Sequence, residues 1–226
     1  MCGRATLTKD KKTLEKRFRA RFTAIDEDHN IINYNVAPTQ LHPVITNEQP
    51  DQLQLFKWGL IPFWAKGAKI GSRMINSRLE TITEKPSFRT AVKRRRCIIP
   101  FDGFYEWKKV DGKKQPHRIV MKDRSIFSMA GIWEKWKNPE TEKLIYSFSI
   151  ITQPPNELLA TIHDRMPAIL LPDIERQWIS PDISTDSALD LIQPIDSDLL
   201  EAYPVSTRVN KASENDPELI EEISGV

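Results

Sequence analysis

The sequence is poor in the residues that build covalent or metal-linked frameworks, with two cysteines, Cys2 and Cys97, and four scattered histidines among 226 residues. Two thiols without a Cys-x-x-Cys pair indicate neither a disulfide framework nor a zinc site, so we expect no metal and no cofactor. Cys97, which precedes Ile98-Ile99-Pro100, is predicted to be an inert thiol buried in a strand.

Long apolar runs are also absent. No segment approaches the length of a membrane span, and the N-terminal MCGRATLTKDKK has no apolar core of the kind that a secretory signal needs. These two absences predict a cytoplasmic protein that does not contact membranes.

Excess charge is missing as well. The formal net charge is only +2, which excludes a polybasic coating protein. Local clusters remain, because residues 93–96 read Lys-Arg-Arg-Arg, Arg17, Arg19 and Arg21 lie close together, and residues 214–222 are acidic. We expect a basic surface that is offset by an acidic C-terminal end.

Helical periodicity is clear near the N-terminus, where Asp10 can cap a helix whose apolar stripe is Leu14, Phe18 and Phe22. The middle of the chain favours strands, and Asp111-Gly112 is a strong hairpin signal. Strands are predicted at residues 53–58, 97–108, 117–122, 126–135 and 146–152, and helices at residues 86–96, 157–162, 173–178 and 187–192.

Strands and helices do not alternate regularly along the chain, which argues against a parallel doubly wound sheet. We predict an α+β protein that forms a single compact domain, mainly antiparallel β, with peripheral helices. The domain should span residues 1–210, and residues 211–226 should form a loosely packed tail.

Cys2 is the first candidate for chemistry, because removal of Met1 would leave an N-terminal cysteine. Its α-amine has a pKa of about 7.7–8.0, so a useful fraction is neutral near pH 7.4, whereas lysine is mostly protonated. The amine can form a Schiff base with an aldehyde, and the thiol can then close a five-membered thiazolidine. The alternative is a small residue that is simply tolerated after the start codon.

Two polar motifs in the first half of the chain could also act. In residues 74–81, Asn76 could orient a polar substrate and Arg78 could clamp a phosphate, although a capped helix start with surface charges fits too. In residues 101–107, Glu106 stands among aromatic residues on a predicted strand. Burial would raise its pKa toward neutrality and suit it to acid–base work, but a glutamate that faces solvent is equally compatible with the pattern.

Two further motifs carry a histidine or exposed aromatic residues. His163 combines a titratable imidazole with the nearby Arg165, and either proton transfer or a structural hydrogen bond would explain it. Phe63 and Trp64 lie on a Gly/Pro-containing loop near lysines, which favours stacking on unpaired bases over packing in the core. Trp58, on a predicted strand, is assigned to the core.

The order of the motifs is far more specific than any one of them. From Cys2 to about Val209, the sequence resembles the SRAP (SOS response-associated peptidase) family. The motifs that carry the resemblance are Met-Cys-Gly-Arg at the start, Tyr34-Asn35-Val36-Ala37-Pro38, Trp58-Gly59-Leu60-Ile61-Pro62, Ile75-Asn76-Ser77-Arg78-Leu79-Glu80-Thr81, Gly103-Phe104-Tyr105-Glu106-Trp107 and His163-Asp164-Arg165-Met166-Pro167.

The resemblance implies a barrel-like, β-rich fold with a positively charged channel for single-stranded DNA. It implies that Cys2 captures the aldehyde of an abasic site as a thiazolidine, which shields the site from strand cleavage. The implied partner is single-stranded DNA containing abasic sites, bound by a monomer that is cytoplasmic and associates with the nucleoid when on DNA.

The resemblance also implies a role for each matching residue. Asn76 would hold the opened sugar or the Cys2 end, Glu106 would shuttle protons and support Met1 removal, and His163 would protonate the sugar ring oxygen. The implied DNA-binding residues are Arg4, Arg78 and Arg165 at phosphates, and Phe63 and Trp64 at bases.

Two other functions use some of the same residues. An N-terminal-nucleophile cysteine peptidase or amidohydrolase would use the Cys2 thiol, but it needs an oxyanion hole and an acyl-enzyme. A non-covalent reader of modified DNA bases would bind equally well after Cys2→Ala. The basic residues and the aromatic residues of the loop fit both DNA functions. A peptidase function gives no reason for these residues.

Overall fold

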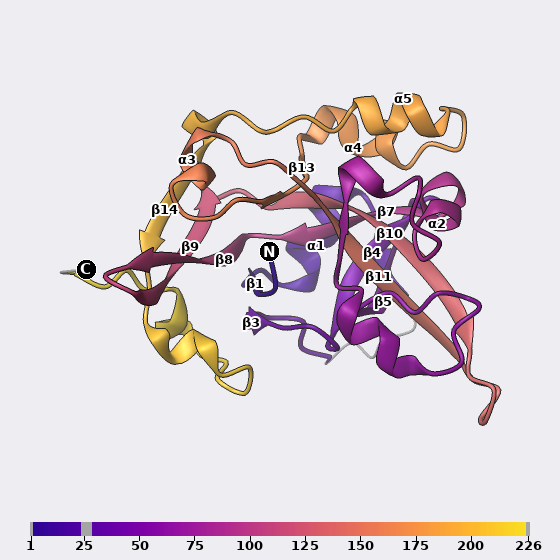
Figure 1. Cartoon of the computed structure of the whole chain (residues 1–226), viewed down its shortest axis with the longest axis horizontal. Coiled ribbons are helices and arrows are strands. Elements are labelled where there is room, and N and C mark those ends of the chain that lie inside the picture. Colours follow the sequence, from indigo (N-terminus) through magenta and orange to yellow (C-terminus); the bar gives the residue numbers. More distant parts are fainter. Residues whose placement is uncertain (1, 24–28, 225–226) are drawn as a thin grey trace.

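Runs of alternating apolar residues form strands that close into a barrel at the centre of the molecule (Figure 1). The computed structural model describes residues 2–23 and 29–224 of the chain. The barrel order is β11-β10-β7-β4-β5, and β5 returns to β11 through a parallel pair that aligns Lys57 with Ser147 and Trp58 with Phe148. The other barrel neighbours are antiparallel.

The described strands are β1 (Ala5–Leu7), β2 (Arg21–Phe22), β3 (Asn33–Val36), β4 (Leu41–Thr46), β5 (Gln52–Trp58), β6 (Asn76–Arg78), β7 (Arg96–Phe101), β8 (Gly103–Val110), β9 (Lys113–Met121), β10 (Phe127–Lys137), β11 (Leu144–Gln153), β12 (Met166–Pro167), β13 (Ile169–Leu170) and β14 (Leu200–Pro204). The α-helices are α1 (Lys11–Phe18), α2 (Arg89–Arg94), α3 (Glu157–Ala160), α4 (Pro172–Trp178) and α5 (Thr185–Asp190). Short 3-10 turns are η1 (Ala68–Arg73), η2 (Leu79–Thr81), η3 (Ser197–Leu199), η4 (Thr207–Asn210) and η5 (Pro217–Ile220).

A second sheet, in the order β14-β9-β8-β1-β3, lies beside the barrel and carries the N-terminal strand. Its longest arm is the β8–β9 hairpin, which turns at Asp111 and Gly112 as predicted. Both turn residues have positive φ angles, 47° and 80°, which the two-residue hairpin turn requires. The turn pairs Val110 with Lys113 and so fixes the register of the whole arm.

The core confirms the predicted fold class, an α+β domain with mainly antiparallel strands in a barrel and helices at the periphery. Trp58 is fully buried, as predicted, and stacks on Phe148 with ring centroids 6.1 Å apart. Cys97 is buried on β7, also as predicted. Among the described helices, none has the length and apolar character to cross a membrane.

Two predicted elements have different boundaries from those expected. The first helix is capped by Asp10 but ends at Phe18, because Arg19 adopts a left-handed conformation with φ 51°. Phe22 therefore lies on β2 and not on the helical stripe. The strand predicted at residues 97–108 is broken at Asp102, where the chain passes from the barrel (β7) to the second sheet (β8).

The basic run at residues 93–96 is less exposed than predicted. Arg95 pairs with Glu134 at 2.8 Å. Arg96 is buried and donates hydrogen bonds to the carbonyl oxygens of Trp178, Val92 and Ser180. Half of this run therefore holds α2 and α4 on the barrel and adds little to a basic surface.

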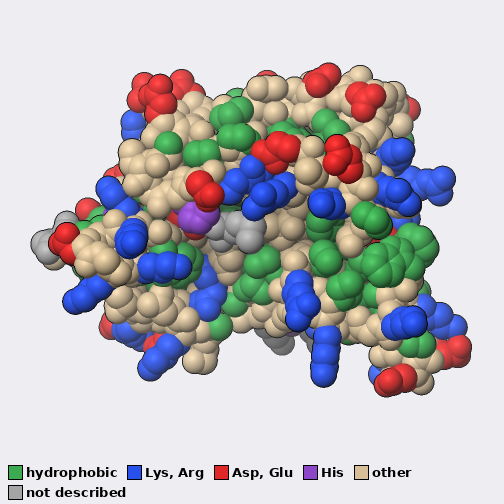
Figure 2. Space-filling view, viewed as in Figure 1, with side chains coloured by type: hydrophobic (Ala, Val, Ile, Leu, Met, Phe, Trp, Pro, Cys, Tyr) green, Lys and Arg blue, Asp and Glu red, His purple; other side chains and the backbone are tan. Residues whose placement is uncertain are grey.

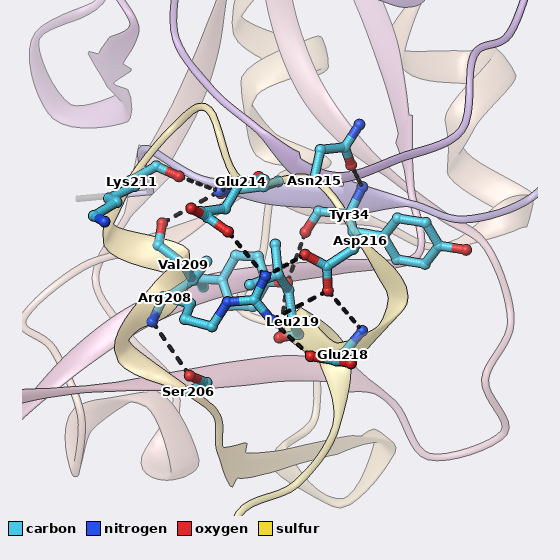
Figure 3. A network of polar contacts seen from close by, with 12 residues as sticks. Tyr34, Ser206, Arg208, Val209, Lys211, Glu214, Asn215, Asp216, Glu218 and Leu219 are labelled. Atoms are coloured by element: carbon cyan, nitrogen blue, oxygen red, sulfur yellow. Dashed lines mark hydrogen bonds and ion pairs between the residues drawn. The ribbon is translucent and has the colours of Figure 1, made fainter.

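The C-terminal segment is packed up to residue 224, which corrects the prediction of a loose tail over that range. Residues 225 and 226 lie outside the described residues. Leu219 is fully buried, and Val205 forms a β-bridge with Glu222. Figure 3 shows the polar side of this packing, in which Arg208 forms ion pairs with Glu214, Asp216 and Glu218 at 2.5–2.8 Å. Three of the five acidic residues at positions 214–222 thus pair with one arginine, which offsets part of the acidic end predicted from the sequence.

Asn35 fastens this segment, because its Nδ2 donates to the carbonyl oxygens of Val209, Lys211 and Glu214 at 2.9–3.3 Å. The side chain is buried, so Asn35→Ala leaves buried carbonyls without partners and is expected to cost about 1–3 kcal/mol of unfolding free energy. Denaturant titration measures that loss, and limited proteolysis should cut the C-terminal segment earlier. Asn30→Ala, at an exposed asparagine, is the control, and equal stability of the two variants would contradict this role.

Candidate active site

Cys2 lies just before β1, the strand that joins the N-terminus to the second sheet. The pairing of Ala5 with Phe104, and a 2.9 Å hydrogen bond from the Tyr105 amide to the Arg4 carbonyl, set β1 against β8. The Cys2 side chain is only 1% exposed and packs in an apolar cluster that includes Phe104. Burial raises the pKa of its thiol well above the ordinary range, and the charge of Glu106 raises this pKa further.

Glu106, on β8, is the buried acid of the site. It is 1% exposed, so the alternative of a glutamate facing solvent is wrong. Burial raises the pKa of Glu106 to about 7, and the charge of Asp164 acts in the same direction. A carboxyl group with such a pKa exchanges protons readily near neutral pH.

His163 brings a second proton-transfer group from the chain that follows α3. Its Nε2 lies 4.0 Å from Glu106 Oε2, and its Nδ1 lies 2.8 Å from Asp164 Oδ1. Burial lowers the pKa of His163, so the ring is mainly neutral near pH 7. The Arg165 amide also donates to Nδ1 at 3.1 Å, which leaves Nε2 directed toward Glu106.

Asn76 closes the site from β6. Its Nδ2 donates a 2.8 Å hydrogen bond to the Cys2 carbonyl, which holds the N-terminal segment in place. Among the described residues, its buried Oδ1 has no hydrogen-bond partner, so the amide keeps one acceptor for a further group. β6 pairs in parallel with β11, where Asn76 aligns with Ile150 at the barrel wall.

Sequence reasoning missed a buried polar network that joins β1 to β8. Asp102 accepts hydrogen bonds from the Thr6 hydroxyl at 2.6 Å and from the Thr8 amide at 2.7 Å, and Arg118 lies 3.4 Å from the same carboxylate. A Cβ at Gly103 would stand 2.8 Å from Thr6 Oγ1, so glycine is needed for this approach. The available signal was Asp-Gly inside a predicted strand, where both residues are disfavoured.

The predicted phosphate-binding arginines lie in different environments. Arg78 is exposed and, within residues 2–23 and 29–224, forms no ion pair. Arg165 instead forms a two-point contact with Glu80, at 2.5 and 3.0 Å, and donates to the Thr152 carbonyl. Arg4 donates to Asn35 and to the carbonyls of Val209 and Asn210. Arg78 is therefore the one of the three with a guanidinium open to a phosphate.

The aromatic loop is exposed, as its predicted stacking role requires. Phe63 and Trp64 are 57% and 48% exposed. A surface hollow of about 760 Å³ is lined in part by Lys57, Lys69 and Arg73. These three residues lie close to the aromatic pair in the sequence. Exposed aromatic residues near cations in the sequence suit binding of single-stranded nucleic acid. Figure 2 shows basic side chains on both sides of a histidine on the face that it draws.

The structure thus brings Cys2, Asn76, Glu106 and His163 together from four separate segments. A buried thiol, a carboxyl group that titrates near pH 7, a neutral imidazole and an amide with a spare acceptor can transfer protons around a nucleophile. The same groups could catalyse addition to an aldehyde or hydrolysis of a peptide bond.

Comparisons with known proteins identify relatives along the whole chain. A family model described as "SOS response associated peptidase (SRAP)" matches residues 1–212. The "Abasic site processing protein YoqW" of Bacillus subtilis is 47% identical over 225 residues, covering 98% of this chain and 99% of that protein. The "Abasic site processing protein HMCES" of Xenopus tropicalis is 32% identical and covers 85% of this chain and 67% of that protein. A crystal structure of a protein from Bacteroides thetaiotaomicron matches with a TM-score of 0.89 and 33% identity, covering 98% of this chain and 100% of that one.

Proposed function

Because the chain belongs to the SOS response associated peptidase (SRAP) family, we propose that it processes abasic sites in single-stranded DNA by bonding covalently to them through Cys2. Relatives at 47% and 32% identity carry the name abasic site processing protein. The observation that carries the covalent step is the meeting of Cys2 with a carboxyl group of pKa about 7 and an adjacent imidazole.

The reaction begins with exposure of the nucleophile. In the 226-residue chain the Cys2 nitrogen belongs to the peptide bond with Met1, and hydrolysis of that bond, which consumes one water, frees the α-amine. Glu106 is placed to accept a proton from the attacking group and to return it to the departing amine. The hydrogen bond from Asn76 to the Cys2 carbonyl holds this end in place.

Capture then joins the free amine to the sugar. An abasic deoxyribose is mostly a closed hemiacetal. It opens to the aldehyde when the protonated fraction of His163 gives its proton to the ring oxygen and the C1 hydroxyl gives its proton to water. The neutral amine adds to the aldehyde carbon, and loss of one water gives the imine. The Cys2 sulfur then bonds to the imine carbon while its proton passes through the Glu106 carboxylate to the imine nitrogen, which yields a thiazolidine.

The state of the thiol fits this order of events. Because burial raises the pKa of Cys2, the sulfur carries its proton until a base is close to it. The α-amine, with an ordinary pKa of about 7.7–8.0, is the better first nucleophile near neutral pH. The sulfur therefore acts second, at the ring closure, where Glu106 provides the base.

The protein would bind DNA without recognising the identity of its bases. The exposed guanidinium of Arg78 would bind a phosphate, and Phe63 and Trp64 would stack on bases beside the lesion. Arg165 would join the phosphate contacts once Glu80 is displaced, and in the described structure it orders the segment that carries His163. Arg4 would keep β1 attached to the C-terminal segment.

Intact-mass analysis tests the proposal directly. The purified protein should lack Met1, and incubation with a single-stranded oligonucleotide containing one abasic site should add the mass of the DNA minus one water. Cys2→Ala and Cys2→Ser, which keep the α-amine but lack the thiol, should form no stable adduct and only an imine that borohydride traps. Loss of Met1 without any adduct would remove the aldehyde mechanism and leave a peptidase or a non-covalent reader of DNA.

A further inference from the structure

The tip of the β8–β9 hairpin carries charge that the fold itself does not use. Residues 107–117 contain four lysines, Lys108, Lys109, Lys113 and Lys114, against a single acidic residue, Asp111. Three of these lysines are exposed and Lys108 is half-buried. None of the four forms an ion pair with any residue that the structure describes, in contrast to Arg208 on the C-terminal segment.

The register makes this charge unfavourable for the hairpin alone. Lys109 stands directly opposite Lys114 on the neighbouring strand. Like charges at directly opposed positions destabilise an antiparallel pair, so the stability of the hairpin gives no reason for the arrangement. A ligand that carries negative charge would explain why the tip as a whole is rich in lysine.

The paired strands β8 and β9 extend from the lysine-rich tip to Glu106 in the candidate active site. Side chains alternate along a strand, so Glu106, Lys108 and Val110 share one face of the arm with their cross-strand partners His117, Gln115 and Lys113. Lys109 and Lys114 lie on the opposite face. At about 3.3 Å per residue, Lys108 and the rung of Lys113 lie roughly 7 and 13 Å along the arm from Glu106. These cations therefore stand within one or two nucleotides of a sugar bound at Cys2.

The arm is also held rigidly from its other face. The Trp107 indole donates to Asn210 Oδ1 at 2.8 Å, and the Tyr105 hydroxyl donates to the Tyr34 carbonyl at 2.8 Å. The two-residue turn at Asp111-Gly112 fixes the end. In Figure 1, β1 lies between this arm, on the left, and the segment around η1 that follows the aromatic loop, on the right.

We propose that Lys108 and Lys113 form a second backbone-binding subsite, which holds the phosphates on one side of the captured sugar, across β1 from the segment that follows the aromatic loop. The proposal rests on the proposed function and adds to it an asymmetry. One flank of the lesion is held by stacking and charge, and the other by charge alone.

The test compares oligonucleotides that extend to different sides of the abasic site. Four single-stranded probes are used, with ten nucleotides on both sides, on the 5′ side only, on the 3′ side only, or with a single nucleotide on each side. The Lys108→Gln/Lys113→Gln double variant should lose less rate on the shortest probe, which offers this subsite at most one phosphate, than on a probe that extends along the subsite. It should lose the gain in rate that one particular arm gives, and keep the gain from the other arm.

Salt provides a second readout. Removal of two phosphate contacts should reduce the slope of log rate against log salt concentration by about 1.4, which is roughly a sevenfold smaller change between 50 and 200 mM salt. The control is Lys12→Gln/Lys16→Gln, which removes the same charge from exposed positions on α1 and should leave the arm dependence unchanged.

Three outcomes would overturn the subsite: an arm dependence like that of wild type, an equal loss on both arms, or the same loss in the α1 control. If wild-type protein forms no adduct with any probe, the proposed function fails instead. Equilibrium binding of the same four probes, followed by fluorescence anisotropy, then still reports whether the hairpin lysines hold one arm.

Discussion

Replacing Glu106 with glutamine should slow adduct formation by roughly 100-fold or more, because general acid–base groups typically contribute that much. Glutamine has nearly the same shape but cannot take the thiol proton at ring closure. Single-turnover capture of an abasic oligonucleotide, with Met1 loss first confirmed by mass, separates this defect from a failure to expose the amine. A rate within a few-fold of wild type would remove Glu106 from the mechanism.

The same substitution should stabilise the fold at neutral and alkaline pH. Burial raises the pKa of Glu106 from 4.5 to about 7, so the folded state binds this proton more tightly than the unfolded state. The stability that the protonated group allows is complete below pH 4.5 and is lost as the pH rises to about 7. Glutamine has no such loss, so the advantage of the variant should grow across this window to roughly 3 kcal/mol.

Denaturant titrations at pH 4.5, 6 and 8 measure that advantage. Glu140→Gln, at an exposed glutamate on the β10–β11 turn, is the matched control and should show no comparable gain. A variant that is both slower and more stable is the result expected when a site holds a buried carboxyl group for chemistry. A variant that is less stable than wild type at pH 8 would contradict the burial cost.

Gly59→Ala should destabilise the protein by roughly 3 kcal/mol. Gly59 has a φ of 123°, and an added Cβ would stand 2.5 Å from the Gly71 carbonyl oxygen, which is backbone and cannot rotate away. Strain at such a φ and overpacking each cost roughly 1–3 kcal/mol. The Gly59 amide also donates to the Phe148 carbonyl, so the strain falls where the barrel closes.

Thermal or denaturant unfolding measures this loss, with Gly67→Ala as the control on the same loop. Gly67 has an extended φ of −165°, and nothing lies within 4 Å of its added Cβ. It should change stability by no more than a few tenths of a kcal/mol. Equal effects at the two glycines would show that the contact between Gly59 and Gly71 is not needed.

The sequence predicted the features that depend on local chemistry. Asp111-Gly112 marks its hairpin because both residues tolerate positive φ, and Asp10 marks a helix start because its side chain caps the Thr13 amide. The helix end was missed, since the periodicity of Leu14 and Phe18 continues to Phe22 although Arg19 turns the chain. Local pattern carries no information on that turn.

Features that join distant segments could not be predicted from pattern. The parallel contact of β5 with β11 aligns Lys57 with Ser147, and Arg4 reaches Val209 across 205 residues of sequence. For the same reason the burial of Arg96 and the packing of the C-terminal segment were not foreseen. The positions of Cys2, Asn76, Glu106 and His163 came from family resemblance, and their mutual geometry came from the fold.

The placement of Cys2 just before β1 also orders events during synthesis. Cys2 is made at the start, but β8, which covers it and carries Glu106, follows about a hundred residues later. At roughly 5–20 residues per second, the nascent N-terminus waits on the order of 5–20 s for its neighbours. A separate aminopeptidase has that interval to remove Met1, whereas removal by the protein's own Glu106 begins only after β8 has paired with β1.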